Sequence, residues 1–479
     1  MRLQNTLTGK VEEFVPRDEG RVGMYVCGPT VQGPPHFGHA RAAIVPDVLR
    51  RYLEWSGYEV FHVRNITDVN DTIIERAQAE GRPAAALAEH YACVWDAQIA
   101  RLGVLPAHIV PRATGHVIEM IQLIERLIAA GAAYESGGDV FFAVRAFPEY
   151  GKLSGRRIDE LVSGARIEPD PRKRDPLDFA LWKGAGADEE LTWPSPWGPG
   201  RPGWHIECSA MALKYLGERF DIHAGGTDLV FPHHENEVAQ AEAATGAQFA
   251  RYWIHNGLLT IGERKMSKSV GNIISLEEAL GRYGPNALRM FYLAVDYRSP
   301  TEFSEARLEE SAAAVDRWLA FERATRGLAP GDGAGGDEWR ARFREAMEDD
   351  LSTPAAQAVL FDLVSEGNRA LEAGQREQAG AARAVFLELA GVLGYRFEAS
   401  DAAGGELVAA LVPMLLNVRE QARARRDFAQ SDAIREGLNA LGIMVEDSPA
   451  GPRWHLQRPT APARGAGAPA PAPASDASA

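Results

Sequence analysis

The sequence predicts an α/β fold in which a parallel sheet is interrupted by an insertion and followed by an α-helical bundle and a small C-terminal module. Strand, turn, helix and strand follow one another near the start, which is the opening of a Rossmann-type parallel sheet. Basic, proline-rich and tryptophan-rich stretches then separate two sheet-like regions. Long alternations of Ala, Leu, Glu and Arg at a spacing of 3.6 come after them and indicate the bundle.

The first half of the sheet begins with a predicted strand at Val22 to Cys27. A turn that ends at Thr30 and a helical stretch follow, and Tyr58 to Val63 alternates like a second strand. Ligands of parallel sheets lie beyond the carboxyl ends of the strands, so Cys27 and Thr30 fall where a site is expected. Pro46 lies within the expected helix, and we therefore expect a kink or a break there.

An insertion is expected from about Gly115 to Pro202, where the chain changes character. It contains a predicted helix near Ile118 to Ala130 and a short predicted strand at Val140 to Val144. Apolar residues resume at Phe220, and a helix is expected to carry His233 to Val238. The second half of the sheet returns there.

The last stretch of the chain is mostly Ala, Pro, Gly and Ser and cannot bury enough apolar surface to order itself. We expect seven parts in order: the first half of the sheet domain (1–115), the connective insertion (116–202), the second half of the sheet domain (203–260), a loop region (261–303), the helical bundle (304–395), the C-terminal module (405–457) and a disordered tail (458–479).

Composition and charge exclude several classes of protein. The 479 residues contain 46% hydrophobic and 24% charged residues, which is ordinary for globular proteins. No apolar run of membrane-spanning length and no signal peptide are recognisable, so we expect a cytoplasmic protein with no membrane partner. The three cysteines do not make a disulfide framework. A net charge of −15 argues against non-specific binding to nucleic acid. A nucleic-acid partner would have to dock on local basic patches.

Two short motifs carry the strongest chemical signal. His36 and His39 flank Gly38, and Lys265 and Lys268 lie in a serine-containing loop bounded by glycines. In each motif two groups that stabilise phosphate charge are three residues apart, so one turn aims both in the same direction. Glycine lets a nucleotide approach the backbone, and a helix N-terminus attracts anions. Together the motifs predict a site that activates a nucleotide.

A candidate metal site consists of two thiols, an imidazole and a carboxylate, which suit tetrahedral zinc: Cys27, Cys208, His233 and Glu237. His233 and Glu237 are four residues apart on an expected helix and share one face. The alternative is that the cysteines are plain core residues, which is common for buried thiols. Cys93 lies in an amphipathic stretch with no nearby ligand, and we expect it to have a packing role.

These residues together resemble cysteinyl-tRNA synthetase, a class I aminoacyl-tRNA synthetase family. The resemblance extends from the first strand to Trp454 and rests on six segments: Met24–Thr30, His36–His39, Arg64–Asp68, Gly203–Ser209, Phe231–Glu237 and Lys265–Ser269. One departure is Phe37, where the family more often has isoleucine or leucine. Neither Phe37 nor Pro46 removes a reacting group.

The resemblance implies a role for each matched position. The ligands of one zinc ion per subunit would be Cys27, Cys208, His233 and Glu237. The residues around the substrate L-cysteine would be Thr30, Thr67 and Trp204. The residues that act in catalysis and bind ATP would be His36, His39, Lys265 and Lys268. The residues on the adenosine or amino-group side would be Gly226 and Asp228.

The implied reaction is attack by the carboxylate of cysteine on the α-phosphate of ATP, with magnesium accompanying the nucleotide. Cysteinyl-adenylate then transfers its acyl group to the 3′ end of tRNA(Cys), whose anticodon the C-terminal module would bind. Zinc prefers a thiolate to the hydroxyl of serine, so no editing domain is required. The family also implies a monomer.

Two other functions compete with this one. A related ATP-dependent ligase passes cysteine to an amino sugar and resembles the catalytic half without a full anticodon-binding end. Here that end is present, with an arginine-rich stretch before Ser431 and a terminal Trp454. A catalytically inactive relative that binds zinc and RNA would be expected to lose a histidine or lysine of the two motifs, and all four are present.

Overall fold

The computed structural model describes residues 1–158, 170–186, 189–261, 264–265, 275–329, 336–397, 402–448 and 451–456. The chain divides into two units, one made of Met1–Leu280 with Gly284–Phe397 and the other of Gly281–Tyr283 with Glu398–Ala479. The predicted tail at 458–479 and the residues from 266 to 274 lie outside the described residues.

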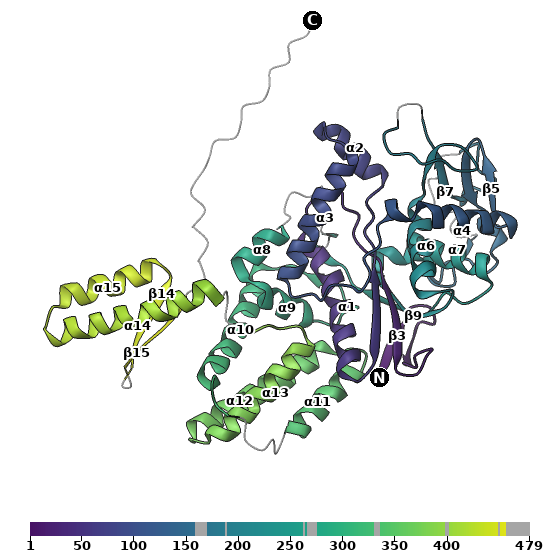
Figure 1. Ribbon diagram of the computed structural model, residues 1–479. Coiled ribbons are helices and arrows are strands. Elements are labelled where there is room, and N and C mark those ends of the chain that lie inside the picture. The colour runs from purple at the N-terminus through teal and green to yellow at the C-terminus, as the bar shows by residue number, and fades with distance from the viewer. Residues whose placement is uncertain are drawn as a thin grey trace, which may run out of the picture. The chain divides into compact units, whose positions relative to one another are not determined.

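The centre of the first unit is a four-stranded parallel sheet in the order β10-β9-β3-β4. Figure 1 labels its two inner strands, β3 and β9. Its strands are β3 (Arg21–Val26), β4 (Glu59–Arg64), β9 (Phe220–Gly226) and β10 (Ala250–Asn256). All three pairings are parallel, so the carboxyl ends of the strands meet at one edge. The predicted α/β class and its first two strands are confirmed, and β9 returns beside β3 after the insertion.

Helix α1 (Phe37–Trp55) connects β3 to β4. A kink or a break was predicted at Pro46, and the break is wrong because the helix continues through this residue. A proline removes one backbone hydrogen bond. Residues on both sides of Pro46 are buried, and their packing holds the helix together. The helix is also anchored by a buried ion pair, in which Nη2 of Arg289 lies 2.6 Å from Oδ2 of Asp47.

Two helices follow β4, namely α2 (Asp71–Glu80) and α3 (Ala84–Arg101). On α3 the buried stripe is formed by residues such as Ala92 and Trp95, whereas Cys93 points to solvent. The sulfur of Cys93 lies 3.6 Å from a carboxylate oxygen of Glu89. The predicted packing role of Cys93 is therefore wrong, because one step along a helix moves a side chain off the buried face.

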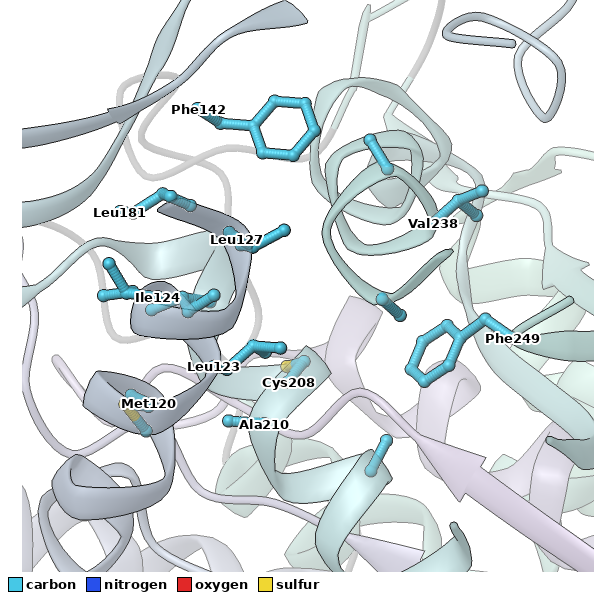
Figure 2. Packing of buried hydrophobic residues seen from close by; sticks show 14 of the residues in the cluster. Met120, Leu123, Ile124, Leu127, Phe142, Leu181, Cys208, Ala210, Val238 and Phe249 are labelled. Atoms are coloured by element: carbon cyan, nitrogen blue, oxygen red, sulfur yellow. The ribbon is translucent and has the colours of Figure 1, made fainter. Parts of the chain in front are cut away.

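The insertion carries α4 (Val117–Ala129) and an antiparallel sheet in the order β5-β6-β7-β8. Its strands are β5 (Ala133–Ser136), β6 (Asp139–Phe142), β7 (Phe179–Gly184) and β8 (Gly200–Pro202). Helices α6 (Trp204–Leu216) and α7 (Glu235–Thr245) pack on α4 around one apolar core. Figure 2 shows that core, with Cys208 of α6 beside Leu123 and Ala210.

Beyond β10 come β11 (Leu259–Ile261), β12 (Arg264–Lys265) and β13 (Thr301–Glu302), followed by the predicted bundle. The helices from here to Val392 are α8 (Leu276–Tyr283), α9 (Pro285–Leu293), α10 (Glu305–Thr325), α11 (Gly336–Glu348), α12 (Thr353–Glu372) and α13 (Arg376–Val392). A hairpin, β1 (Arg2–Asn5) with β2 (Lys10–Glu13), precedes the sheet. Single turns are η1 (Ala113–His116), η2 (Val144–Ala146), η3 (Thr227–Leu229) and η4 (Val230–His234).

The second unit has a small core of its own, with Val412, Leu416, Leu438 and Ile443 buried. Its elements are α14 (Ala402–Ala424), α15 (Phe428–Ala440), β14 (Ile443–Ser448) and β15 (Gly451–Leu456), the two strands pairing antiparallel. Among the described residues of the whole chain, none of the helices is both long and apolar enough to cross a membrane.

Candidate active site and metal-donor cluster

A cavity of about 410 Å³ opens at the carboxyl edge of the central sheet, where parallel sheets bind their ligands. The predicted site residues that line it are Cys27, Thr30, His36, His39, Trp204, Gly226 and Asp228. They come from the ends of β3 and β9 and from the first turns of α1 and α6. Residues more than 200 positions apart in the sequence therefore surround one space.

The histidine motif, His36 to His39, forms the N-terminus of α1. The backbone N–H of His36 donates to Nδ1 of His39 over 3.2 Å, and the two imidazole rings stack with their centroids 3.6 Å apart. Both side chains are half-buried and face the cavity. Two imidazoles at a helix N-terminus can together stabilise the charge of a phosphate.

The second motif is described only at its start. The backbone of Lys265 belongs to β12 and pairs with Thr260 of β11. The preceding residues Gly257 to Leu259 line the cavity, so the hairpin that carries the motif emerges from the cavity wall. Lys268 lies outside the described residues.

Next to the cavity lie the four residues that we call the metal-donor cluster: Cys27, Cys208, His233 and Glu237. One ligand atom from each lies within 4.8 Å of all the others. The two sulfur atoms are 3.6 Å apart, Sγ of Cys27 is 3.5 Å from Oε1 of Glu237, and that oxygen is 3.1 Å from Nε2 of His233. Helix α7 begins at Glu235, later than expected, yet the turn η4 keeps His233 on the side of Glu237.

These separations fit a tetrahedral metal. Ligands bound to zinc at about 2.0 to 2.3 Å lie roughly 3.3 to 3.8 Å from one another along the edges of a tetrahedron. The three separations in the cluster fall in or close to that range. Two thiols, an imidazole and a carboxylate also form a donor set that zinc accepts.

Burial favours the uncharged forms of Cys27, His233 and Glu237 when no metal is bound. Desolvation raises the pKa of the Cys27 thiol and of the Glu237 carboxyl well above their ordinary values. It lowers the pKa of His233 well below its ordinary value, and the neighbouring His205 and His223 lower it further. A divalent cation would reverse the balance for the acids, because it binds their ionised forms.

A second shell of histidines holds the donors in place. Nε2 of His223 lies 2.9 Å from Oε2 of Glu237, and Nδ1 of His205 lies 2.9 Å from Nδ1 of His233. Nε2 of His234 lies 3.3 Å from Sγ of Cys27. Such partners fix the orientation of a metal ligand. None of these three histidines was predicted to support the site, although His223 on β9 and His234 next to His233 on η4 were a visible signal.

A second donor set of four, Cys27, His223, His234 and Glu237, satisfies the same distance limit. It shares two members with the metal-donor cluster, so the two sets describe neighbouring positions in one pocket. The first set includes both thiols and is the better match to the preference of zinc for sulfur.

Thr67 lies under the cavity wall and does not line it. Its hydroxyl donates to Oε2 of the buried Glu207 over 2.9 Å, and its backbone forms a bridge with Thr30. The N–H of Gly28 donates to Oδ1 of Asn65, and a Cβ at Gly28 would come within 1.6 Å of the carbonyl oxygen of Asn65. Thr67 therefore supports the segment from which Thr30 faces the cavity.

Trp204, the first residue of α6, and Gly226, the last residue of β9, also line the cavity. The ring of Trp204 stacks on His233 with centroids 4.2 Å apart, which links the wall of the cavity to the metal-donor cluster. At Gly226 a Cβ would meet Oδ1 of Asp228 at 2.5 Å, so a side chain there would displace that carboxylate. Asp228 is exposed and can reach a ligand in the cavity.

Comparison with protein families gives three matches along the chain. The family model of the class I (C) tRNA synthetase catalytic domain matches residues 13–313. The DALR domain model matches residues 342–398, and the model of the cysteinyl-tRNA ligase anticodon-binding domain matches residues 409–454.

Curated relatives match over nearly their whole length. The cysteine–tRNA ligase of Desulforudis audaxviator is 49% identical over 476 residues, covering 95% of this chain and 99% of the relative. The cysteine–tRNA ligase of Geobacter sulfurreducens is 48% identical over 484 residues, covering 95% and 100%. Among solved structures, Mycobacterium tuberculosis methionyl-tRNA synthetase in complex with methionyl-adenylate has a TM-score of 0.57 at 18% identity, covering 78% of this chain and 89% of that one. That likeness concerns the fold.

Proposed function

This chain belongs to the cysteine–tRNA ligases, a family of class I aminoacyl-tRNA synthetases, and from that premise we propose that a zinc ion held by the metal-donor cluster selects its amino acid. The observation that carries the proposal is the buried convergence of two thiols, an imidazole and a carboxylate beside the cavity. The reaction is the ATP-dependent attachment of cysteine to tRNA.

The need for a metal follows from the similarity of cysteine to serine. A pocket that relies on shape separates such near-isosteres by only about 10- to 200-fold. When bound, zinc would accept the soft thiolate of cysteine in preference to the hydroxyl of serine. Trp204 stacks on the ligand His233 and lines the cavity, so it would confine the substrate side chain next to the metal.

The nucleotide binds at the other end of the cavity in this proposal. His36 and His39 stabilise the charge that develops as the carboxylate of cysteine attacks the α-phosphate of ATP, which magnesium accompanies. Lys265 and Lys268 supply further positive charge from the second motif. Gly226 and Asp228 lie on the side of the adenosine or the amino group. Thr30 contacts the amino acid, with Thr67 supporting it from below.

The tRNA completes the proposal. Class I catalysis ends with transfer of the activated acyl group to the terminal ribose, and the match to an anticodon-binding domain at residues 409–454 supports tRNA(Cys) as the acceptor. It also disfavours the amino-sugar ligase, which lacks a full anticodon-binding end. A monomeric state and a cytoplasmic location remain predictions from the sequence.

Zinc content and cysteine charging in two cysteine variants test the proposal. Cys208→Ala removes a ligand and is expected to abolish bound zinc and cysteine activation. Cys93→Ala removes an exposed thiol on α3 and is expected to leave both intact. Wild-type zinc content in the Cys208 variant would overturn the metal assignment.

A charging assay with purified tRNA(Cys), ATP and magnesium separates the candidate reactions. Cysteine should be attached to the tRNA and serine should not. Formation of cysteinyl-adenylate without any charged tRNA would make the amino-sugar ligase the better account.

A further inference from the structure

Tyr25 occupies a position directly behind the metal-donor cluster. It lies on β3 two residues before Cys27, so both side chains point to the same face of the sheet. Its partner in register on β9 is His223, and the two rings lie with centroids 5.2 Å apart. Tyr25 and His223 therefore form one layer of side chains beneath the cluster.

The two members of this layer differ in their hydrogen bonds. Nε2 of His223 lies 2.9 Å from Oε2 of Glu237. The hydroxyl of Tyr25 is fully buried and makes no hydrogen bond of normal geometry to any residue in the described part of the chain. Cys208 belongs to the same buried cluster as Tyr25. Burial raises the pKa of Tyr25, and the nearby Cys208, Cys27 and Glu237 raise it further. A buried donor without an acceptor is rare and destabilising, so its position beside a thiol requires an explanation.

We propose that Tyr25 is a positioning residue of the zinc site, whose hydroxyl donates a hydrogen bond to the thiolate of Cys208 when the metal is bound. The inference rests on the proposed zinc ligation. A thiol sulfur is a weak acceptor, whereas a metal-bound thiolate carries charge and accepts strongly. The donor that lacks a partner in the neutral cluster thus gains one on metal binding. Tyr25 orients Cys208 as His223 orients Glu237.

The test is Tyr25→Phe in the full-length protein, which removes only the hydroxyl. Tyr52→Phe is the matched control, since Tyr52 is equally buried but its hydroxyl lies 3.4 Å from Glu348, in a different part of the first unit. Zinc release to a chromogenic chelator is expected to be about tenfold faster in Tyr25→Phe and unchanged in the control. In the cobalt-substituted protein, the thiolate-to-metal charge-transfer band should move to longer wavelength, because an unbonded thiolate gives up an electron more easily.

Thermal unfolding of the metal-free protein provides the decisive contrast. Removal of an unpartnered donor should leave the Tm of metal-free Tyr25→Phe equal to or above that of the wild type. A lower Tm in the metal-free variant, with unchanged zinc release and an unchanged cobalt band, would mean that Tyr25 only packs and would overturn the inference. If the purified wild-type protein binds no zinc, the proposed zinc ligation itself is refuted.

Discussion

The two ends of the cavity are built in different ways. At one end the donors of the metal-donor cluster are tied together by direct contacts and by a second shell of histidines, and three of the four are buried. At the other end His36 and His39 are half-buried at a helix N-terminus, and the hairpin that leads to the second motif begins beside them.

This difference separates two tasks of one enzyme. In the proposed function, selection between cysteine and serine would depend on a fixed set of ligands, and the contacts around Cys27, His233 and Glu237 leave these donors little freedom to move. Activation of ATP depends on positive and dipolar groups around an accessible space. The comparison predicts that changes at one end should leave the measured property of the other end intact.

The largest effect is expected at the nucleotide end. His39→Ala removes one of two stacked imidazoles that face the cavity and should lower the kcat of cysteine-dependent pyrophosphate exchange by about 100- to 1,000-fold. Zinc content should not change, because His39 is absent from the described metal-donor sets. Loss of zinc in this variant would show that the two ends are not independent.

A smaller effect is expected from the second shell of the cluster. His205→Phe removes the partner of Nδ1 of His233 while keeping an aromatic ring of similar size. Zinc affinity should fall by about 10- to 100-fold, measured by competition with a chelator of known affinity. The KM for ATP serves as the control and should remain at the wild-type value.

The pH dependence of metal binding tests the metal-donor cluster in the unmutated protein. Burial raises the pKa of Glu237 above its ordinary 4.5 and that of Cys27 above its ordinary 9.0. Because both pKa values are higher in the folded protein than in the unfolded chain, the protonated groups stabilise the metal-free fold at low pH. This stability is lost as the pH rises through the pKa values of the folded protein. Zinc requires the ionised forms, so its affinity should rise by about tenfold per pH unit for each proton released.

The pH dependence of zinc affinity can be measured as the difference in Tm between zinc-loaded and metal-free protein from about pH 6 to about pH 8. The difference should widen as pH rises. A difference that is constant over this range would contradict the burial of protonated donors in the metal-free cluster.

Much of the fold could be predicted from the sequence, because strands such as Val22 to Cys27 carry a clear apolar pattern and end beside chemically distinctive residues. Cys27 and Thr30 could be placed at a site for the same reason, whereas Trp204, Gly226 and Asp228 were implied only by the resemblance to the family. The break at Pro46 was predicted wrongly, since buried neighbours on both sides compensate for one lost hydrogen bond. The packing role of Cys93 was also wrong, because a helical stretch does not by itself specify which face is buried.

The supporting residues could not be predicted in the same way. His205 and His223 contact donors on other elements, and Tyr25 is proposed to do the same. Such contacts depend on the register between β3 and β9 and on the angle at which α6 and α7 meet the sheet. Neither property can be read from a single sequence. Thr67 was expected beside the amino acid, and its place under the cavity wall depends on a bridge to Thr30.

Pyrophosphate exchange with cysteine and with serine, before and after removal of zinc by a chelator, tests the central claim most directly. With zinc bound, the kcat/KM for cysteine should exceed that for serine by well over the roughly 200-fold limit of shape selection. Removal of zinc should lower the kcat/KM for cysteine at least about 100-fold and leave the kcat/KM for serine nearly unchanged. Added zinc should restore the kcat/KM for cysteine. Equal losses for both amino acids, or no loss for either, would contradict selection by the metal-donor cluster.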